Sequence, residues 1–194
     1  MREAALPGAI ARRGAARGRS ASRSLAPDRT ERVLGWLALA MLAVVLTAIA
    51  RGHGTWQRVP WTIWVHLATM ALALALTPAI LWHPRGNTRH RALGYAWVGS
   101  LAITAVLSFW IRTSHPGHFS WIHLISAWVL VMLPIVVLTA RSHNVRRHRR
   151  AVRGLVIGAL LVAGFFTFPF GRLLGDWLFG VSHAERAPTK TPLH

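Results

Sequence analysis

The sequence predicts an all-α, polytopic integral membrane protein, folded as a bundle of five transmembrane helices. Three observations lead to this prediction: the overall composition, the presence of five long apolar runs, and the uneven distribution of arginine. Of the 194 residues, 53% are hydrophobic and only 14% are charged, and the mean hydropathy is +0.38. Soluble domains carry about a quarter charged residues, so this chain lacks the charge needed to cover a water-facing surface.

Five apolar runs approach or exceed the length needed to cross a membrane. A helix rises about 1.5 Å per residue and the hydrocarbon core is about 30 Å thick, so about 20 residues suffice. The first four runs contain no Asp, Glu, Lys or Arg, whereas the fifth carries one Arg and one Asp near its far end. The expected spans are residues 33–50, 61–82, 93–111, 121–140 and 155–179.

These runs divide the chain into a membrane domain, residues 31–180, and two tails. Residues 1–30 are rich in Arg, Ala and Ser and show no apolar periodicity, which predicts a disordered basic tail. Residues 181–194 form a short polar segment, and we expect a second disordered tail there.

The basic residues predict which side of the membrane each connection occupies. The N-terminal tail, the second loop and the fourth loop carry eight, three and six Lys or Arg residues, whereas the alternate segments carry two, one and two. Basic residues accumulate in cytoplasmic loops. We therefore expect a multi-pass protein of the bacterial inner membrane with its N-terminus in the cytoplasm.

Several functional classes are excluded or disfavoured by the sequence. The chain has no cysteine, which excludes disulfides, thiolate metal sites and cysteine nucleophiles. It carries no nucleotide-binding, serine hydrolase or zinc protease motif. The net charge of +18 would suggest nucleic acid in a soluble protein, but here the basic residues are split among three loop segments, so we expect no nucleic-acid partner.

Hydroxyl-bearing residues form stripes along the predicted helices. The third run carries Ser100, Thr104 and Ser108 at a spacing of four, and the second carries His66 and Thr69 on one face. Such stripes usually face neighbouring helices, where hydroxyls form hydrogen bonds across the interface.

Four histidines occupy paired positions on this topology. His66 and His123 lie on the second and fourth runs near their outer ends, and His90 and His148 lie just before the third and fifth runs at the inner rim. In an up-down bundle the second helix can face the fourth, and the third can face the fifth.

Two interpretations of these pairs remain open. Neutral imidazoles on opposed helices can bind haem iron from both sides, so His66 with His123 and His90 with His148 are candidate ligands of haem b. The arginines that flank the inner pair would suit haem propionates. Alternatively, the histidines are structural and anchor helix ends at the membrane interface. His115 and His118 have a spacing that metal ligands also show, but in a loop without a carboxylate, and whether the chain binds a metal stays open.

The order of several motifs resembles a family of bacterial membrane proteins that is catalogued as domain of unknown function 2306. The motifs are W-V-H-L-A from Trp64, R-H-R-A-L-G-Y from Arg89 and F-S-W-I-H-L-I-S from Phe119, followed by R-H-R-R-A-V-R-G-L-V-I-G from Arg147 and F-T-F-P-F-G-R-L-L-G from Phe166. The resemblance covers roughly residues 60–180. It implies a multi-span membrane protein and brings no activity with it.

The histidine arrangement is more distantly similar to that of the ascorbate-dependent transmembrane di-haem cytochromes. The chain departs from them because its inner histidines lie at the rim and no reductant-binding motif is present. The first functional hypothesis is therefore electron transfer through haem b, with redox partners or other membrane subunits. The alternative is a non-catalytic membrane protein, an accessory subunit or small-molecule carrier with structural histidines; whether the chain is an enzyme stays open.

Overall fold

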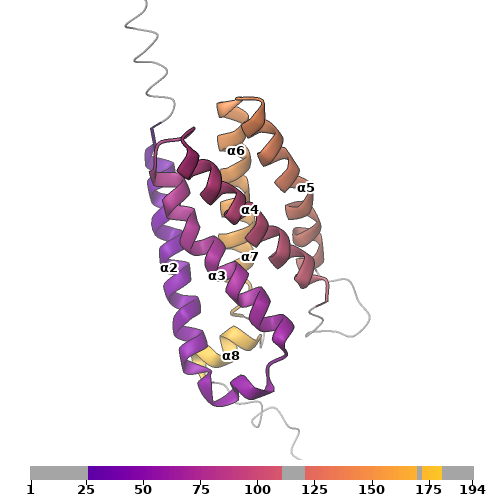
Figure 1. Ribbon diagram of the computed structural model, residues 1–194. Coiled ribbons are helices and arrows are strands. Elements are labelled where there is room, and N and C mark those ends of the chain that lie inside the picture. Colours follow the sequence, from indigo (N-terminus) through magenta and orange to yellow (C-terminus); the bar gives the residue numbers. More distant parts are fainter. Residues whose placement is uncertain (1–25, 111–120, 170–171, 181–194) are drawn as a thin grey trace, which may run out of the picture.

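The computed structural model describes residues 26–110, 121–169 and 172–180, and within these residues the regular elements are helices. Figure 1 shows long helices that run up and down beside one another, as the alternating topology predicts. They are α2 (Arg29–Arg51), α3 (Trp61–Trp82), α4 (Thr88–Ser108) and α5 (Trp121–Arg141). All four are long and apolar enough to cross a membrane.

The helix ends follow local capping chemistry. Asp28 caps α2 through its side chain, which accepts a hydrogen bond from the Glu31 N–H, and the Glu31 side chain returns a bond to the Asp28 N–H. This reciprocal capping box satisfies two backbone donors that a helix start otherwise leaves without partners. At the start of α4 the Asn87 side chain accepts a hydrogen bond from the N–H of His90, without a return bond. Helix α2 begins at Arg29, two residues before the expected start of the membrane domain at residue 31; residues 1–25 and 181–194, which make up most of the two expected tails, lie outside the described part.

The fifth run does not form the single helix that we expected over residues 155–179. Helix α6 (Val145–Leu155) begins ten residues earlier and continues without a gap through the π-helical segment η2 (Val156–Val162) into α7 (Ala163–Phe165). Helix α8 (Leu173–Phe179) is separate. Pro169 lies between the two pieces, and proline has no N–H with which to continue a helix. The structure therefore supports four candidate spans and does not confirm a fifth.

The remaining elements close the end of the bundle where α2 finishes. The 3₁₀ helix η1 (His53–Arg58) joins α2 to α3, and α8 packs against α2. Trp177 of α8 lies over Gly52 and donates a hydrogen bond from its indole N–H to Thr55 Oγ1 at 2.7 Å. A side chain at position 52 would occupy the place of the Trp177 ring, so the glycine permits this contact.

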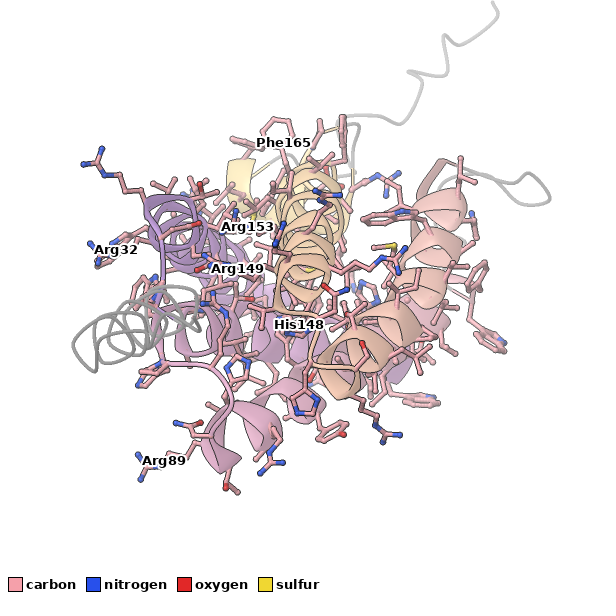
Figure 2. All side chains as sticks on the ribbon, turned by 90° about the horizontal axis from the view of Figure 1, so that it is seen from above. Arg32, Arg89, His148, Arg149, Arg153 and Phe165 are labelled. Carbon is pink, nitrogen blue, oxygen red and sulfur yellow. The ribbon has the colours of Figure 1, made fainter. Side chains whose placement is uncertain are left out.

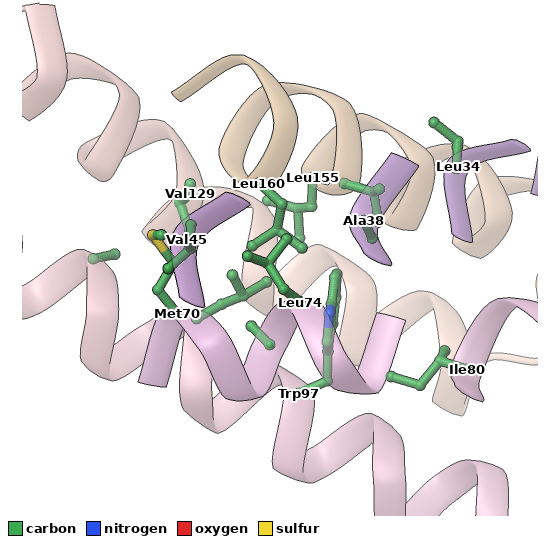
Figure 3. Packing of buried hydrophobic residues seen from close by; sticks show 14 of the residues in the cluster. Leu34, Ala38, Val45, Met70, Leu74, Ile80, Trp97, Val129, Leu155 and Leu160 are labelled. Carbon is green, nitrogen blue, oxygen red and sulfur yellow. The ribbon is translucent and has the colours of Figure 1, made fainter. Parts of the chain in front are cut away.

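The core is apolar and is shared by all the long helices. Figure 3 shows Leu34 and Ala38 of α2, Leu74 of α3, Trp97 of α4 and Leu155 of α6 converging on one another. The Trp97 indole N–H donates to Thr77 Oγ1 at 3.0 Å, which satisfies the one polar atom of this buried ring.

Large apolar side chains also cover the outside of the bundle. Trp36, Leu46, Leu124, Val131 and Leu138 are all about half exposed or more. In the four candidate spans, only 22–39% of the most apolar window is buried inside the protein. Exposing such a surface to water would cost free energy, and monomeric soluble proteins rarely expose continuous apolar patches of this kind. A lipid bilayer is the environment that these helices fit.

Candidate functional site

The structure places five charged residues together at the end of the bundle where α2 begins. We call this group, composed of Asp28, Glu31, Arg85, Arg149 and Arg153, the inner-end charge cluster. Glu31 is 1% exposed and forms an ion pair with Arg85, which lies in the connection between α3 and α4. Because the start of α2, the α3–α4 connection and α6 all meet here, the described parts of the three arginine-rich segments lie at one end of the bundle.

Two arginines of α6 complete the cluster. Arg149 donates from Nε to Glu31 Oε1 at 3.0 Å and from one terminal nitrogen to Asp28 Oδ2 at 2.9 Å. Arg153 follows one turn later, forms an ion pair with Asp28, and donates to Glu31 Oε1 at 3.1 Å. Figure 2 shows Arg149 and Arg153 between α6 and α2 in the view from above. The cluster therefore joins α2 to α6.

Electrostatics keep the exposed member of this cluster ionised. Burial would by itself raise the pKa of Asp28, but the hydrogen bond from the Glu31 N–H and the nearby guanidinium groups of Arg153 and Arg149 lower that pKa below its usual value. In the sequence these arginines indicate topology, and those beside the inner histidines would also suit haem propionates, but nothing there assigns a partner to Glu31. The D-x-x-E pattern before the first run was the available signal, because a capping box places its glutamate in the first turn of a helix.

The inner histidine pair is brought together beside this cluster. His90 in the first turn of α4 and His148 in the first turn of α6 are near enough that their charges would repel each other, and both also sense the charge of Arg85. His148 Nδ1 lies 3.1 Å from the Val136 carbonyl oxygen of α5. A carbonyl can only accept, so Nδ1 carries the proton and Nε2 carries a lone pair.

The two inner histidines differ in how their rings are held. His90 Nδ1 is buried and has no hydrogen-bond partner. Burial lowers the pKa of His148, and Arg85 lowers it further, although the Val136 carbonyl acts in the opposite direction. Burial and Arg85 thus disfavour the charged form of His148, and ligation of iron requires the neutral form.

The two histidines of the outer pair, His66 and His123, have different surroundings. His66 Nδ1 lies 3.2 Å from the Thr104 carbonyl oxygen of α4, so its Nε2 also carries a lone pair. The Thr69 and Thr104 hydroxyls are 2.7 Å apart, which bears out the expected hydroxyl contact between these two helices. His123 is 9% exposed and packs its ring against Phe109 at 5.8 Å between centroids.

A small cavity adjoins His66. Its volume is about 60 Å³, and its lining comes from α3, α4, α5, η2 and α7. The polar part of the lining is His66 with the hydroxyls of Thr104, Ser108, Ser126 and Thr167, and small side chains such as Ala159 and Gly164 form much of the rest. His123 does not line it, although Ser126 lies one turn further along the same helix.

The donor chemistry of these histidines fits haem b, whereas the size of the cavity does not. Haem-binding histidines commonly donate their other ring nitrogen to a carbonyl or carboxylate, as His66 and His148 do here. Sites for ligands of drug size measure about 300–1,000 Å³, so a cavity of about 60 Å³ would have to widen before a macrocycle could enter. The described residues contain no group of three or more candidate metal ligands.

Comparisons with family models, with curated proteins and with solved structures found no match for this chain.

Proposed function

We propose that this chain is a multi-pass protein of the bacterial inner membrane that transfers electrons through haem b. The observation that carries the proposal is the state of His66 and His148. Each ring is held through Nδ1 by a carbonyl of a neighbouring helix, so that each offers Nε2 as a ligand. Haem b, when bound, supplies one-electron exchange at its iron.

The four histidines would hold two haem groups, one in each half of the bundle. His90 and His148 would hold one group near the inner-end charge cluster, and His66 with His123 would hold another in the opposite half. The apolar helices around both sites would exclude water and so tune the redox potential.

An absorption spectrum of the purified full-length protein, oxidised and then reduced with dithionite, tests this proposal. We expect a Soret band and reduced α-bands, with less haem per protein in His66→Ala and in His148→Ala. His53→Ala is the matched control, because His53 is exposed and belongs to neither pair. A colourless protein from cells supplied with haem precursor, or equal haem content in all four proteins, would refute the proposal.

A second candidate is favoured by the volume of the cavity. A cavity of about 60 Å³ has room for a few water molecules but not for a macrocycle. An accessory subunit or small-molecule carrier with structural histidines would have such a cavity, and the carbonyl bonds of His66 and His148 would then serve only to join helices. It predicts colourless protein and histidine variants that lose thermal stability without any spectral change.

The orientation in the membrane has its own test. If the N-terminus is cytoplasmic, a reporter inserted in the turn between α5 and α6 will be active on the cytoplasmic side, and a reporter inserted after η1 will be active outside. The reverse pattern would contradict the orientation but would leave the haem proposal standing.

A further inference from the structure

The cavity beside His66 is lined by polar side chains whose hydrogens are already engaged. His66 Nδ1 donates to the Thr104 carbonyl oxygen at 3.2 Å, and Ser108 Oγ donates to the same oxygen at 2.8 Å. Thr167 Oγ1 donates to the Gly164 carbonyl oxygen at 2.5 Å. A hydroxyl has one hydrogen and a neutral imidazole has one N–H, so these three side chains have no hydrogen left for a ligand.

The hydroxyl of Thr104, a fourth polar group of the lining, is engaged in the same way. Thr69 directs its single hydrogen at the carbonyl oxygens of Val65 and His66, at 2.9 and 3.1 Å. The 2.7 Å contact between the Thr69 and Thr104 hydroxyls must then use the hydrogen of Thr104. These four side chains therefore offer a ligand acceptors alone, namely the imidazole Nε2 and three hydroxyl oxygens.

A lining of this kind selects a ligand that donates hydrogen bonds. Buried acceptors without a donor cost free energy, and a ligand that needed a donor would find none on these four side chains. The described residues that line the cavity, which include Ser126 as a fifth polar residue, contain no Asp, Glu, Lys or Arg. The volume of about 60 Å³ limits the ligand to a few non-hydrogen atoms.

From these observations we propose that the cavity binds a small amine, whose nitrogen carries several N–H donors and needs no donor in return. Its N–H groups would meet acceptors from α3, α4 and the residues that follow α7. The neutral amine and its ammonium ion are the two sources of this chemistry. The inference rests on the second candidate function, the small-molecule carrier, and gives that carrier a class of ligand.

Haem at the outer pair would use the same atom, His66 Nε2, so an amine and an outer haem exclude each other. Haem at the inner pair would not interfere, because neither His90 nor His148 lines the cavity. The absorption spectrum of each preparation therefore reports on haem separately from any measurement of amine binding.

A scintillation proximity assay with radiolabelled methylammonium and the purified full-length protein in detergent measures this binding. Unlabelled ammonium should displace the probe. Acetone, which accepts hydrogen bonds and donates none, should not displace it, and potassium, which has the charge of ammonium but no N–H, should displace it less well than ammonium does. Between about pH 7.5 and 9, where histidine is already neutral, retention that rises with pH indicates the neutral amine and constant retention indicates the ammonium ion.

Three variants link the binding to the cavity. Thr167→Val removes one acceptor and keeps the shape of the side chain, so it should weaken retention about fivefold, the equivalent of about 1 kcal/mol for one hydrogen bond. Thr47→Val is the matched control, because Thr47 also donates to a carbonyl one turn earlier but is exposed and does not line the cavity. Ala159→Leu should abolish retention by filling the space, with its thermal unfolding measured alongside.

Retention that ammonium displaces, that Thr167→Val weakens and that Thr47→Val leaves unchanged supports the amine site. Displacement by acetone or potassium as readily as by ammonium, equal retention in the two threonine variants, or full retention in Ala159→Leu overturns it. Haem that is lost from His66→Ala also overturns it, because haem then holds Nε2. A colourless protein that retains no methylammonium removes the amine site but leaves a carrier of another ligand standing. Retention without uptake by proteoliposomes supports the site and refutes the carrier.

Discussion

Replacement of Glu31 by Gln tests whether the inner-end charge cluster holds the bundle together. Glu31 is 1% exposed and Arg85, its nearest partner, is 7% exposed, so the substitution leaves a buried guanidinium without its counter-charge. Removing one partner of a buried ion pair costs about 3–5 kcal/mol, chiefly because the other charge stays buried. For a chain of this size each kcal/mol corresponds to roughly 2–4 °C in Tm, so we expect a fall of about 6–20 °C.

The assay is thermal unfolding of the purified protein in detergent, followed by tryptophan fluorescence. Asp28→Asn is the matched control, because the Asp28 side chain is 44% exposed and asparagine is an equally good helix N-cap. Exposed ion pairs contribute about 0.2–1 kcal/mol, so this control should lose only a few degrees. If Glu31→Gln unfolds at the same temperature as Asp28→Asn, the reasoning from burial is wrong.

Three other substitutions test further contacts. Thr77→Val leaves the buried indole N–H of Trp97 without an acceptor and should cost about 1–3 kcal/mol in thermal or denaturant unfolding. Gly52→Ala places a methyl group 2.1 Å from a ring atom of Trp177, so it should displace α8, lower stability by about 1–3 kcal/mol and change the tryptophan emission. The lowered pKa of His148 means that the unfolded chain binds this proton more readily, so stability should decline as the pH falls below about 6.5, and His148→Gln should flatten that decline.

Matched changes elsewhere separate these effects from general damage. Thr47→Val removes an exposed hydroxyl that donates to the Ala43 carbonyl of its own helix, and Gly54→Ala adds a methyl group to open space. Both should leave the unfolding midpoint within about 1 kcal/mol of wild type. A pH dependence of stability that persists unchanged in His148→Gln would assign the titration to another group.

The sequence by itself determined the class of the fold and most of the long helices. The second run was predicted at residues 61–82 and forms α3 over Trp61–Trp82, and the fourth differs from α5 by one residue. This success has a simple cause: a helix that faces lipid must be apolar over about 20 residues, whichever neighbours it has. The alternation of the runs likewise predicted which connections share an end of the bundle, whereas the side of the membrane inferred from the arginine count stays a prediction.

The break in the fifth run depended on information that composition does not contain. Residues 155–179 are apolar almost throughout, yet the helix ends at Phe165 and resumes at Leu173. Pro169 is visible in the sequence, but a proline in a membrane helix can either kink the helix or end it. The packing of α8 on α2 through Trp177 and Gly52 decides between the two outcomes.

The partners of individual polar side chains were decided only by the tertiary structure. Topology predicted that His90 and His148 would lie near one another, and they do, but it could not show that Val136 and Thr104 supply the carbonyls that hold His148 and His66. Glu31 was inconspicuous in the sequence because a single acid beside an apolar run predicts little. Apolar burial is non-directional and can be read from periodicity, whereas ion pairs and hydrogen bonds need particular atoms within about 3 Å, and that placement depends on how distant helices pack.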